Sequence, residues 1–568
     1  MTIAHAAYSL IFMQKHDSLQ IDEQQQIAHP RRRMYLKKLF WAFTALSTLA
    51  TAEATDIPNG AVTLEQCIQI ALENNLNLRI TNYQPRLAGL NLQGSYGAYD
   101  PRLSLGGTDS FRESKGRENP LEFTIPTSKT DSFRGNLGLN GVLLPSTGMR
   151  YNLGLNSSET TGTSASNFPF GSYGTGFFAN LTQPLLKGAW IDGTRMSIKL
   201  NKQQIKNSSL TVIRQITQTV SSVELAYYAL IASRENVTVA EETLALTEKN
   251  FSNQKRRAEV GTLAKSQLPQ LEAELYSQKA SLLSVQNSYA DSVNNLKRFL
   301  TDDFASVQDA ELLPVGELNP VQTVFSRNDS WAKALNQRPE ILQSKISLEN
   351  TDIRLKYNKN QLYPQLDLRA TYGLSGSDSA DVMHRYPDGT ISQYPLRDPN
   401  TGKYVSRSFV NRAASFNTSF KDVREFDYPN YSIGLQFSIP IPNRSARANY
   451  KTAQLQKEQA VLQHKELEQS IMIEIDRLIR DAEYRFEQIE VTRQARLSSE
   501  LALQNDTKRY SEGAVENYQV LQAQRDLTSR RYAEINAKVQ YLTALSRLAQ
   551  AEGSTLDNNN INVEIEEE

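Results

Sequence analysis

The chain has 568 residues and no formal net charge, with charged residues making up 22% of it. This balance gives no indication of binding to nucleic acid or to an acidic substrate. The single cysteine, Cys67, excludes an intrachain disulfide and a thiolate metal site. Because it lies in a helical apolar pattern, we expect it to be a small packing residue and not a reactive thiol.

The only concentrated apolar segment lies near the N-terminus and predicts export. A basic region precedes about a dozen apolar residues, fewer than the ~20 that a transmembrane helix needs. Ala52-Glu53-Ala54 fits cleavage by signal peptidase. We therefore expect residues 34–54 to be a signal peptide and residues 1–33 to be an extension or a misassigned start. Arg32-Arg33 also resembles a twin-arginine signal, which is the less favoured alternative for this segment.

An internal duplication organises the rest of the chain. Ala71-Leu72-Glu73-Asn74-Asn75 corresponds to Ala334-Leu335-Asn336-Gln337-Arg338, and in each half a proline (Pro101 or Pro364) opens a strand-like run about thirty residues later. Each repeat then reads as helix, strands, long helix, turn and helix. The predicted organisation is a first repeat at 55–300, a linker or equatorial segment at 301–330, a second repeat at 331–552 and an acidic tail at 553–568.

Both repeats predict helices far longer than a globular core requires. Residues 187–260 lack proline, and apolar residues recur at steps of three and four from Ile213 to Phe251. The return segment, Leu268 to Leu300, has the same seven-residue period, which is typical of coiled coils. About 70 helical residues reach roughly 100 Å. The helices alone would also fit a non-conducting periplasmic coiled-coil rod. Such a rod does not explain the strands between them.

The strands between the helices alternate strictly between apolar and polar residues. The pattern is clearest in Leu366–Leu374 and Tyr431–Ile439, and it recurs in Phe133–Asn140 and Tyr151–Asn156. Period two over about ten residues is the signature of a transmembrane barrel, with its apolar face toward lipid. A periplasmic β-sandwich is the alternative. It is less consistent with strands that are isolated between very long helices.

One chain supplies too few strands to close a barrel. We predict two strands in the second half and two to four in the first, whereas the smallest membrane barrels need about eight. Open sheet edges cannot face lipid, so several chains must share one barrel. The tight turn at 144–148 is predicted to be periplasmic if 131–143 and 149–158 both span. The longer segments 113–130, 159–172 and 378–427 are predicted to be extracellular loops.

Residues that carry out chemistry are scarce. After cleavage the chain keeps only His384 and His464, which are too few and too far apart for a metal or catalytic centre. There is no phosphate-binding glycine loop and no nucleophile elbow. We therefore expect no catalytic, metal-binding or cofactor-binding site and no cofactor. A surface hydrolase would need a catalytic cluster that the sequence lacks.

Over roughly 62–550 the chain resembles the TolC-like outer membrane efflux factor family. The resemblance rests on the duplicated helix opening, the proline-led strand starts, Gln183-Pro184-Leu185-Leu186, and the paired tips Gly261-Thr262 and Gly513-Ala514. It implies an α+β membrane protein in which a homotrimer shares an outer-membrane β-barrel, continued by a long antiparallel α-helical coiled-coil tunnel across the periplasm. It implies a passive export channel, and not an enzyme, within a tripartite efflux or type I secretion complex.

The resemblance also implies partners. These are outer-membrane lipid, a periplasmic membrane-fusion adaptor and an inner-membrane pump of the proton-driven or ABC type, with no nucleic acid. The familiar pattern has four barrel strands per protomer, and the additional hairpin here leaves the number open between four and six.

The helical tips are where the resemblance places the periplasmic gate and the adaptor-docking surface. The expected residues are Gly261, Thr262, Leu263, Ser266, Gln267, Gly513, Ala514, Val515, Glu516, Gln519 and Gln522. Family members often carry carboxylates just past the second tip, where this chain has Gln519 and Gln522. A strongly acidic gate is therefore not expected from these positions, although Glu512 and Glu516 are nearby.

Overall fold

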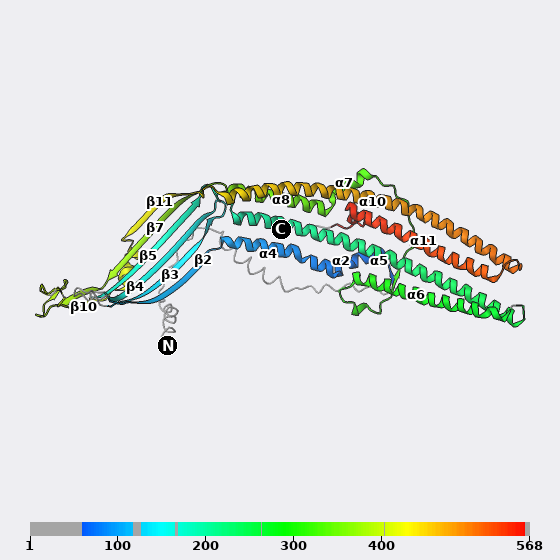
Figure 1. The fold of residues 1–568 in the computed structure, drawn as a ribbon, viewed down its shortest axis with the longest axis horizontal. Helices are drawn as coiled ribbons and strands as arrows, with labels where there is room; N and C mark the ends of the chain where they lie inside the picture. The colour runs from blue at the N-terminus through cyan, green and yellow to red at the C-terminus, as the bar shows by residue number, and fades with distance from the viewer. Residues whose placement is uncertain are drawn as a thin grey trace, which may run out of the picture. The chain divides into compact units, whose positions relative to one another are not determined.

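The computed structural model describes residues 60–116, 127–164, 168–262, 264–400, 402 and 404–562. The predicted signal peptide at 34–54 and the extension at 1–33 lie outside the described residues, as do Leu263 and the last part of the predicted acidic tail, 563–568. All described residues belong to one unit, Ile57–Glu568. In it, the largest sheet lies at one end, and two long helical hairpins run from it and end side by side (Figure 1).

The main sheet has six antiparallel strands in the order β11-β7-β5-β4-β3-β2. The first repeat supplies β2 (Arg102–Ser114), β3 (Ser128–Leu144), β4 (Met149–Thr163) and β5 (Pro169–Pro184), and the second supplies β7 (Gln365–Ser379) and β11 (Pro429–Ser438). The first half therefore has four strands, the upper end of the prediction. The additional hairpin is β3–β4, and both of its strands extend beyond the predicted 131–143 and 149–158.

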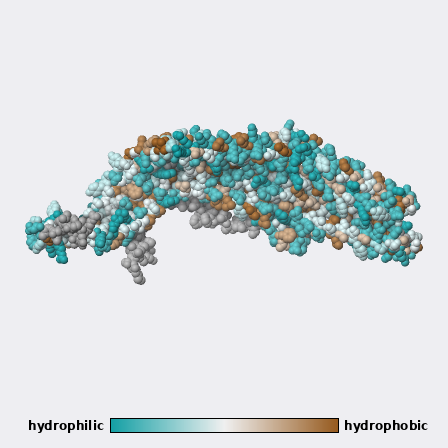
Figure 2. Space-filling view, in the orientation of Figure 1, coloured by the Kyte–Doolittle hydropathy of each residue, from teal (hydrophilic) through white to brown (hydrophobic). Residues whose placement is uncertain are grey.

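The register of the sheet aligns one apolar face from edge to edge. A row of directly paired residues crosses all six strands on this face: Leu103, Leu139, Leu153, Ala179, Tyr372 and Tyr431. The neighbouring row on the opposite face is polar: Arg102, Asn140, Asn152, Asn180, Thr371 and Ser432. Figure 2 shows apolar residues gathered along the β11 side of the strand region. Such a face matches a barrel wall with lipid on one side and water on the other.

The helices next to the sheet follow the order of its strands. α4 (Tyr83–Tyr96) leads into β2, α5 (Gly193–Glu259) follows β5, α8 (Pro339–Asn360) leads into β7, and α10 (Arg444–Ser511) follows β11. α4 packs on α5, α5 on α8, and α8 on α10. α5 and α10 have 67 and 68 residues, so each is about 100 Å long. The prediction of very long helices is confirmed.

The return helices complete two antiparallel hairpins. α6 (Leu268–Leu300) packs along α5, and α11 (Asn517–Glu552) packs along α10. The two hairpins contact each other through α5 and α11. None of the described helices has an apolar stretch long enough to cross a membrane.

The largest apolar core lies midway along the helices. Here α2 (Leu64–Asn74) packs on α5 and α6, and β1 (Gly60–Val62) pairs in parallel with β6 (Leu312–Pro314). Cys67 is fully buried in this core beside residues such as Leu230 and Leu300. Burial raises the pKa of its thiol to about 11, so it is uncharged at neutral pH. The prediction that Cys67 is a packing residue is confirmed.

Three smaller helices pack against the long ones. They are α3 (Leu76–Thr81), α7 (Arg327–Gln337) and α12 (Thr555–Asn558). α12 packs on α5 and α11, and Thr555 is almost fully buried. The first part of the segment predicted as an acidic tail is therefore folded against the helices.

The predicted surface loop at 378–427 contains regular structure. It holds β8 (Asp381–Arg385), β9 (Ile391–Ser392), β10 (Arg407–Arg412) and α9 (Phe416–Glu425). α9 packs on β5 and β7, where Ser419 is fully buried and its Oγ lies 2.9 Å from both Thr175 Oγ1 and the Gly376 carbonyl. The helix covers the end of the apolar face that is farther from the long helices. The predicted loop at 159–172 is also shorter, since β4 and β5 extend into it.

The two-faced sheet predicts opposite outcomes for neighbouring substitutions in β11. Ile433 lies on the apolar face and is 75% exposed, whereas Ser432 lies in the polar row. Arginine on a lipid face costs about 2–4 kcal/mol near the middle of the bilayer. We expect Ile433→Arg to reduce strongly the amount of protein assembled in the outer membrane and Ser432→Arg to leave it near wild type. Membrane fractionation with immunoblotting checks this, and equal yields of the two variants would contradict it.

Candidate functional site

The first helical tip is a glycine turn. The Gly261 backbone has a φ of +79°, in the left-handed region that favours glycine. The Thr262 N–H donates to the Arg257 carbonyl at 2.9 Å, and the Gly261 N–H donates to the Ala258 carbonyl at 3.3 Å. These bonds complete the end of α5 and reverse the chain toward α6.

The second tip repeats this geometry. Gly513 has a φ of +74°, the Ala514 N–H donates to the Arg509 carbonyl at 2.9 Å, and the Gly513 N–H donates to the Tyr510 carbonyl at 3.1 Å. The two repeats thus reverse direction through the same hydrogen-bond pattern.

Most of the predicted tip residues are exposed to solvent. In the described part of the chain Val515 is half-buried, and the exposed ones are Gly261, Thr262, Ser266, Gln267, Gly513, Ala514, Glu516, Gln519 and Gln522. Leu263 lies outside the described residues. The tips therefore present an open polar surface that suits contact with another molecule.

Polar contacts join the hairpins close to their tips. Arg257 of α5 donates to the Tyr510 hydroxyl of α10 at 2.6 Å, and its guanidinium lies 5.4 Å from the centroid of the Tyr510 ring. Arg525 of α11 pairs with Glu274 of α6. Sequence analysis missed all four residues, because each pair brings together helices from different repeats and no local pattern marks it.

The carboxyl group of Glu274 is largely enclosed at this contact. Glu274 is 8% exposed. The hydrogen bond from Arg525 is the main cause that lowers the Glu274 pKa below its ordinary value, and a second hydrogen bond from Gln278 at 2.8 Å acts in the same direction. Glu274 is therefore ionised at neutral pH, and its pairing with Arg525 links the two hairpins.

Carboxylates also lie near the two predicted tip glutamines. Asp506 of α10 and Asp526 of α11 line a groove with Gln519 and Gln522. Gln522 Nε2 donates to Asp526 Oδ1 at 3.1 Å. Asp526 lies one helical turn beyond Gln522. Asp506 lies near these glutamines only because α10 and α11 fold back on each other. Comparison by position therefore missed both acidic groups.

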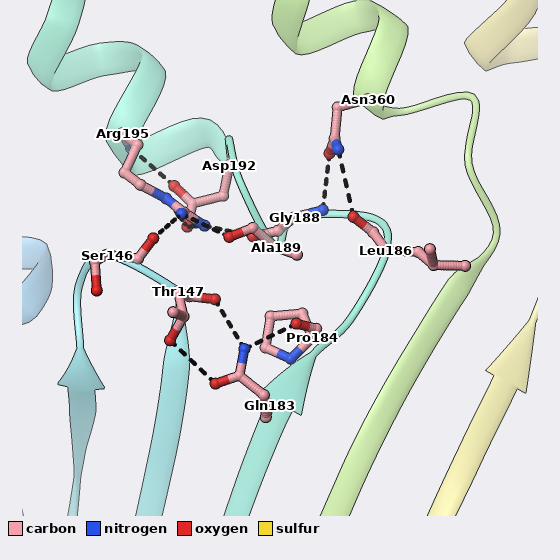
Figure 3. Close-up of polar contacts among 10 residues, drawn as sticks. All are labelled: Ser146, Thr147, Gln183, Pro184, Leu186, Gly188, Ala189, Asp192, Arg195 and Asn360. Carbon is pink, nitrogen blue, oxygen red and sulfur yellow. Dashed lines mark hydrogen bonds and ion pairs between the residues drawn. The ribbon is translucent and has the colours of Figure 1, made fainter.

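A second polar cluster lies where the strands meet the helices (Figure 3). Arg195, in the first turn of α5, donates from Nη1 to the Ser146 carbonyl at 2.6 Å and to the Ala189 carbonyl at 2.8 Å. Its Nη2 donates to the Gly188 carbonyl and to Asp192, and its Nε also donates to Asp192. All five N–H groups of the guanidinium are thus used. Asp192 also caps α5 by accepting from the Arg195 N–H at 2.8 Å.

The β3–β4 turn is fixed from its other side as well. The Thr147 hydroxyl donates to Gln183 Oε1 at 3.0 Å, and Gln183 Nε2 donates back to the Thr147 carbonyl at 3.1 Å. Asn360, at the end of α8, accepts from the Gly188 N–H at 2.8 Å and donates to the Leu186 carbonyl at 3.3 Å. The turn therefore lies at the helical end of the sheet, on the side where the sequence placed it.

Neither cluster has the composition of a reaction centre. Among the residues that the structure describes, no three His, Cys, Asp or Glu side chains are grouped so that they would hold a metal ion. Instead, the tips present exposed polar surfaces, and the sheet has one apolar and one polar face.

Comparison with known proteins agrees with this architecture. Residues 141–301 and 331–554 match the family described as outer membrane efflux protein. The chain is 20% identical over 385 residues to the probable outer membrane lipoprotein SilC of Salmonella typhimurium, covering 67% of this chain and 70% of SilC.

Solved structures share the fold. A membrane protein from Pseudomonas aeruginosa superposes with a TM-score of 0.59 at 17% identity, covering 86% of this chain and 92% of that one. The Campylobacter jejuni CmeC outer membrane channel superposes with a TM-score of 0.58 at 15% identity, covering 87% and 86%. Since the family match spans both repeats and more than half of the residues, the chain belongs to the TolC-like outer membrane efflux protein family and is an outer-membrane channel, not an enzyme.

Proposed function

We propose that three copies of the chain form one passive export duct, in which a shared barrel opens to the outside and the helical hairpins enclose a tunnel in the periplasm. The proposal is supported above all by the six-stranded sheet, whose apolar and polar faces run unbroken between two unpaired edges. Polar backbone groups at such edges are not tolerated in lipid, so the sheet requires further copies. Transport through the duct is passive, and a partner pump supplies the energy.

In this proposal the tips have two roles. They close the tunnel when the channel is idle, and they bind a periplasmic membrane-fusion adaptor when an inner-membrane pump, proton-driven or ABC type, is engaged. The exposed glycine turns at Gly261 and Gly513 support the docking role, because their backbone is accessible and the neighbouring side chains are polar. The contacts Arg257–Tyr510 and Arg525–Glu274 support the closing role, because they link the two hairpins near their ends.

The docking role is tested by adding bulk and charge at one tip. We expect Gly261→Arg to abolish export while assembly in the membrane persists. The large positively charged side chain would obstruct binding of the adaptor at the tip. Gly389→Arg is the matched control, since Gly389 also has a positive φ and open space around its Cβ position but lies in the segment between β8 and β9. Export of a pump substrate from whole cells is the measurement. Wild-type export by Gly261→Arg would remove the docking role.

The closing role is tested by neutralising Glu274. We expect Glu274→Gln to raise the mean conductance of the purified channel in planar bilayers, because it removes the charge that pairs with Arg525. Glu272→Gln is the control on an exposed position of the same helix. If conductance is unchanged by Glu274→Gln, this contact does not hold the gate.

The pH dependence of the same contact has a defined sign. Separation of the hairpins returns the Glu274 pKa toward the ordinary glutamate value of ~4.3. The closed form is therefore favoured by this pair above that value and loses the contribution as pH falls through the lowered pKa. Wild-type conductance should rise in acid, and the rise should be smaller in Glu274→Gln.

A further inference from the structure

The hairpin β3–β4 is an integral part of the sheet. β3 pairs with β2 along the whole of β2, from Arg102 to Ser114, and β4 pairs with β5 from Arg150 to Thr163. The β3–β4 turn is fixed to the start of α5 through Arg195 and to β5 through Gln183 (Figure 3). Removing the hairpin from the wall would break both ladders and the polar junction. The hairpin is therefore part of whatever barrel the chain builds.

The two free edges of the sheet fit each other in direction. β2 leaves the helical end of the sheet and β11 returns to it, so β2 of one copy and β11 of the next meet antiparallel, as strands do in membrane barrels. The apolar residues on these edge strands are widely exposed in one chain: Leu105 is 84% exposed on β2, and Tyr431 is 81% exposed on β11. An even number of strands per chain keeps the pairing antiparallel around a closed ring.

The widths of the two parts also match. Four helices per copy, α4, α5, α8 and α10, adjoin the six strands. In three copies, twelve helices packed 8–10 Å apart give a ring of about 96–120 Å in circumference. Eighteen strands spaced ~4.8 Å apart and tilted by about 40° give about 110 Å, whereas twelve give about 75 Å. Eighteen strands therefore continue the helical ring without narrowing it.

We infer that three copies of this chain close a barrel of eighteen strands, with six from each copy and β2 of one copy paired with β11 of the next. The inference rests on the proposed trimer and adds the strand number and the seam. Barrel diameter grows roughly linearly with strand number, so this barrel is about 1.5 times as wide as one of twelve strands. Barrels of 16–18 strands leave an aqueous channel. The helical tips, and not the barrel, then limit the size of the cargo.

Cysteine pairs distinguish this wall from one of twelve strands. In a Cys67→Ala background, three double variants are compared: Leu105→Cys with Leu137→Cys, Leu155→Cys with Phe177→Cys, and Leu105→Cys with Phe177→Cys. The first two pairs join directly opposed residues. The third pair is three strand spacings apart, about 14 Å, which is beyond the ~7 Å limit between the Cα atoms of a disulfide.

The membranes are oxidised, the protein is denatured, and free thiols are counted by the gel shift from a maleimide–polyethylene glycol tag. The first two variants should lose most of their tagging and the third should keep both thiols. Oxidation of the third pair with the first two left free would mean that β2 pairs with β5 and that the hairpin is outside the wall.

Native mass spectrometry of the detergent-extracted assembly gives the number of chains, on which the total of eighteen strands also depends. Three chains are expected, and any other number overturns the total of eighteen. A three-chain assembly with the expected thiol pattern but without export would count against the proposed function and leave the barrel inference standing.

Discussion

The need to pair every backbone N–H and C=O group of a strand that lies in lipid governs this molecule. Within the described residues, the main sheet satisfies its inner strands and leaves β2 and β11 each with one open edge. A soluble protein can protect such edges with charge or with a covering loop, but an apolar face in a bilayer leaves only closure. Association of copies is thus a condition of the fold in the membrane, and the direction of β2 and β11 determines which edges meet.

The arrangement of the helices follows from the arrangement of the strands. Because each barrel-adjacent helix continues a strand of the sheet or leads into one, the order α4-α5-α8-α10 repeats the strand order. The side chains of Arg195 and Asn360 join the strand ends to α5 and α8 by donating hydrogen bonds to backbone carbonyls. From the junction, the helices of the two hairpins continue with a seven-residue apolar pattern, and each hairpin reverses direction in a glycine turn at its tip. Length and rigidity come from regular helix, and polar side chains link the two hairpins near the tips.

The sequence predicted those features that depend on local periodicity. Alternation in Tyr431–Ile439 indicated β11, the seven-residue pattern from Leu268 to Leu300 matches α6, and Gly261 and Gly513 marked both reversals. It left the strand number open, because alternation marks β3 and β4 as strands but only their pairing with β2 and β5 shows that the hairpin belongs to the sheet.

Features that depend on contacts between distant segments could not be predicted from local pattern. α9 is short and packs on β5 and β7, whereas its largely polar and charged sequence resembles that of a solvated loop. Glu274 and Arg525 are separated by most of the second repeat, and neither lies in a local motif. Glu274 is buried in the folded chain, and its partner Arg525 comes from the other hairpin.

The central claim is that this chain is one part of a closed wall shared by several copies. Electron cryomicroscopy of the full-length protein in lipid nanodiscs tests it most directly, because the strands are seen in the environment that forbids open edges. The account predicts a three-fold assembly in which the β2 edge of each copy continues without a gap into the β11 edge of the next. A single chain in lipid with both edges unpaired, or a ring with an open seam, would contradict it.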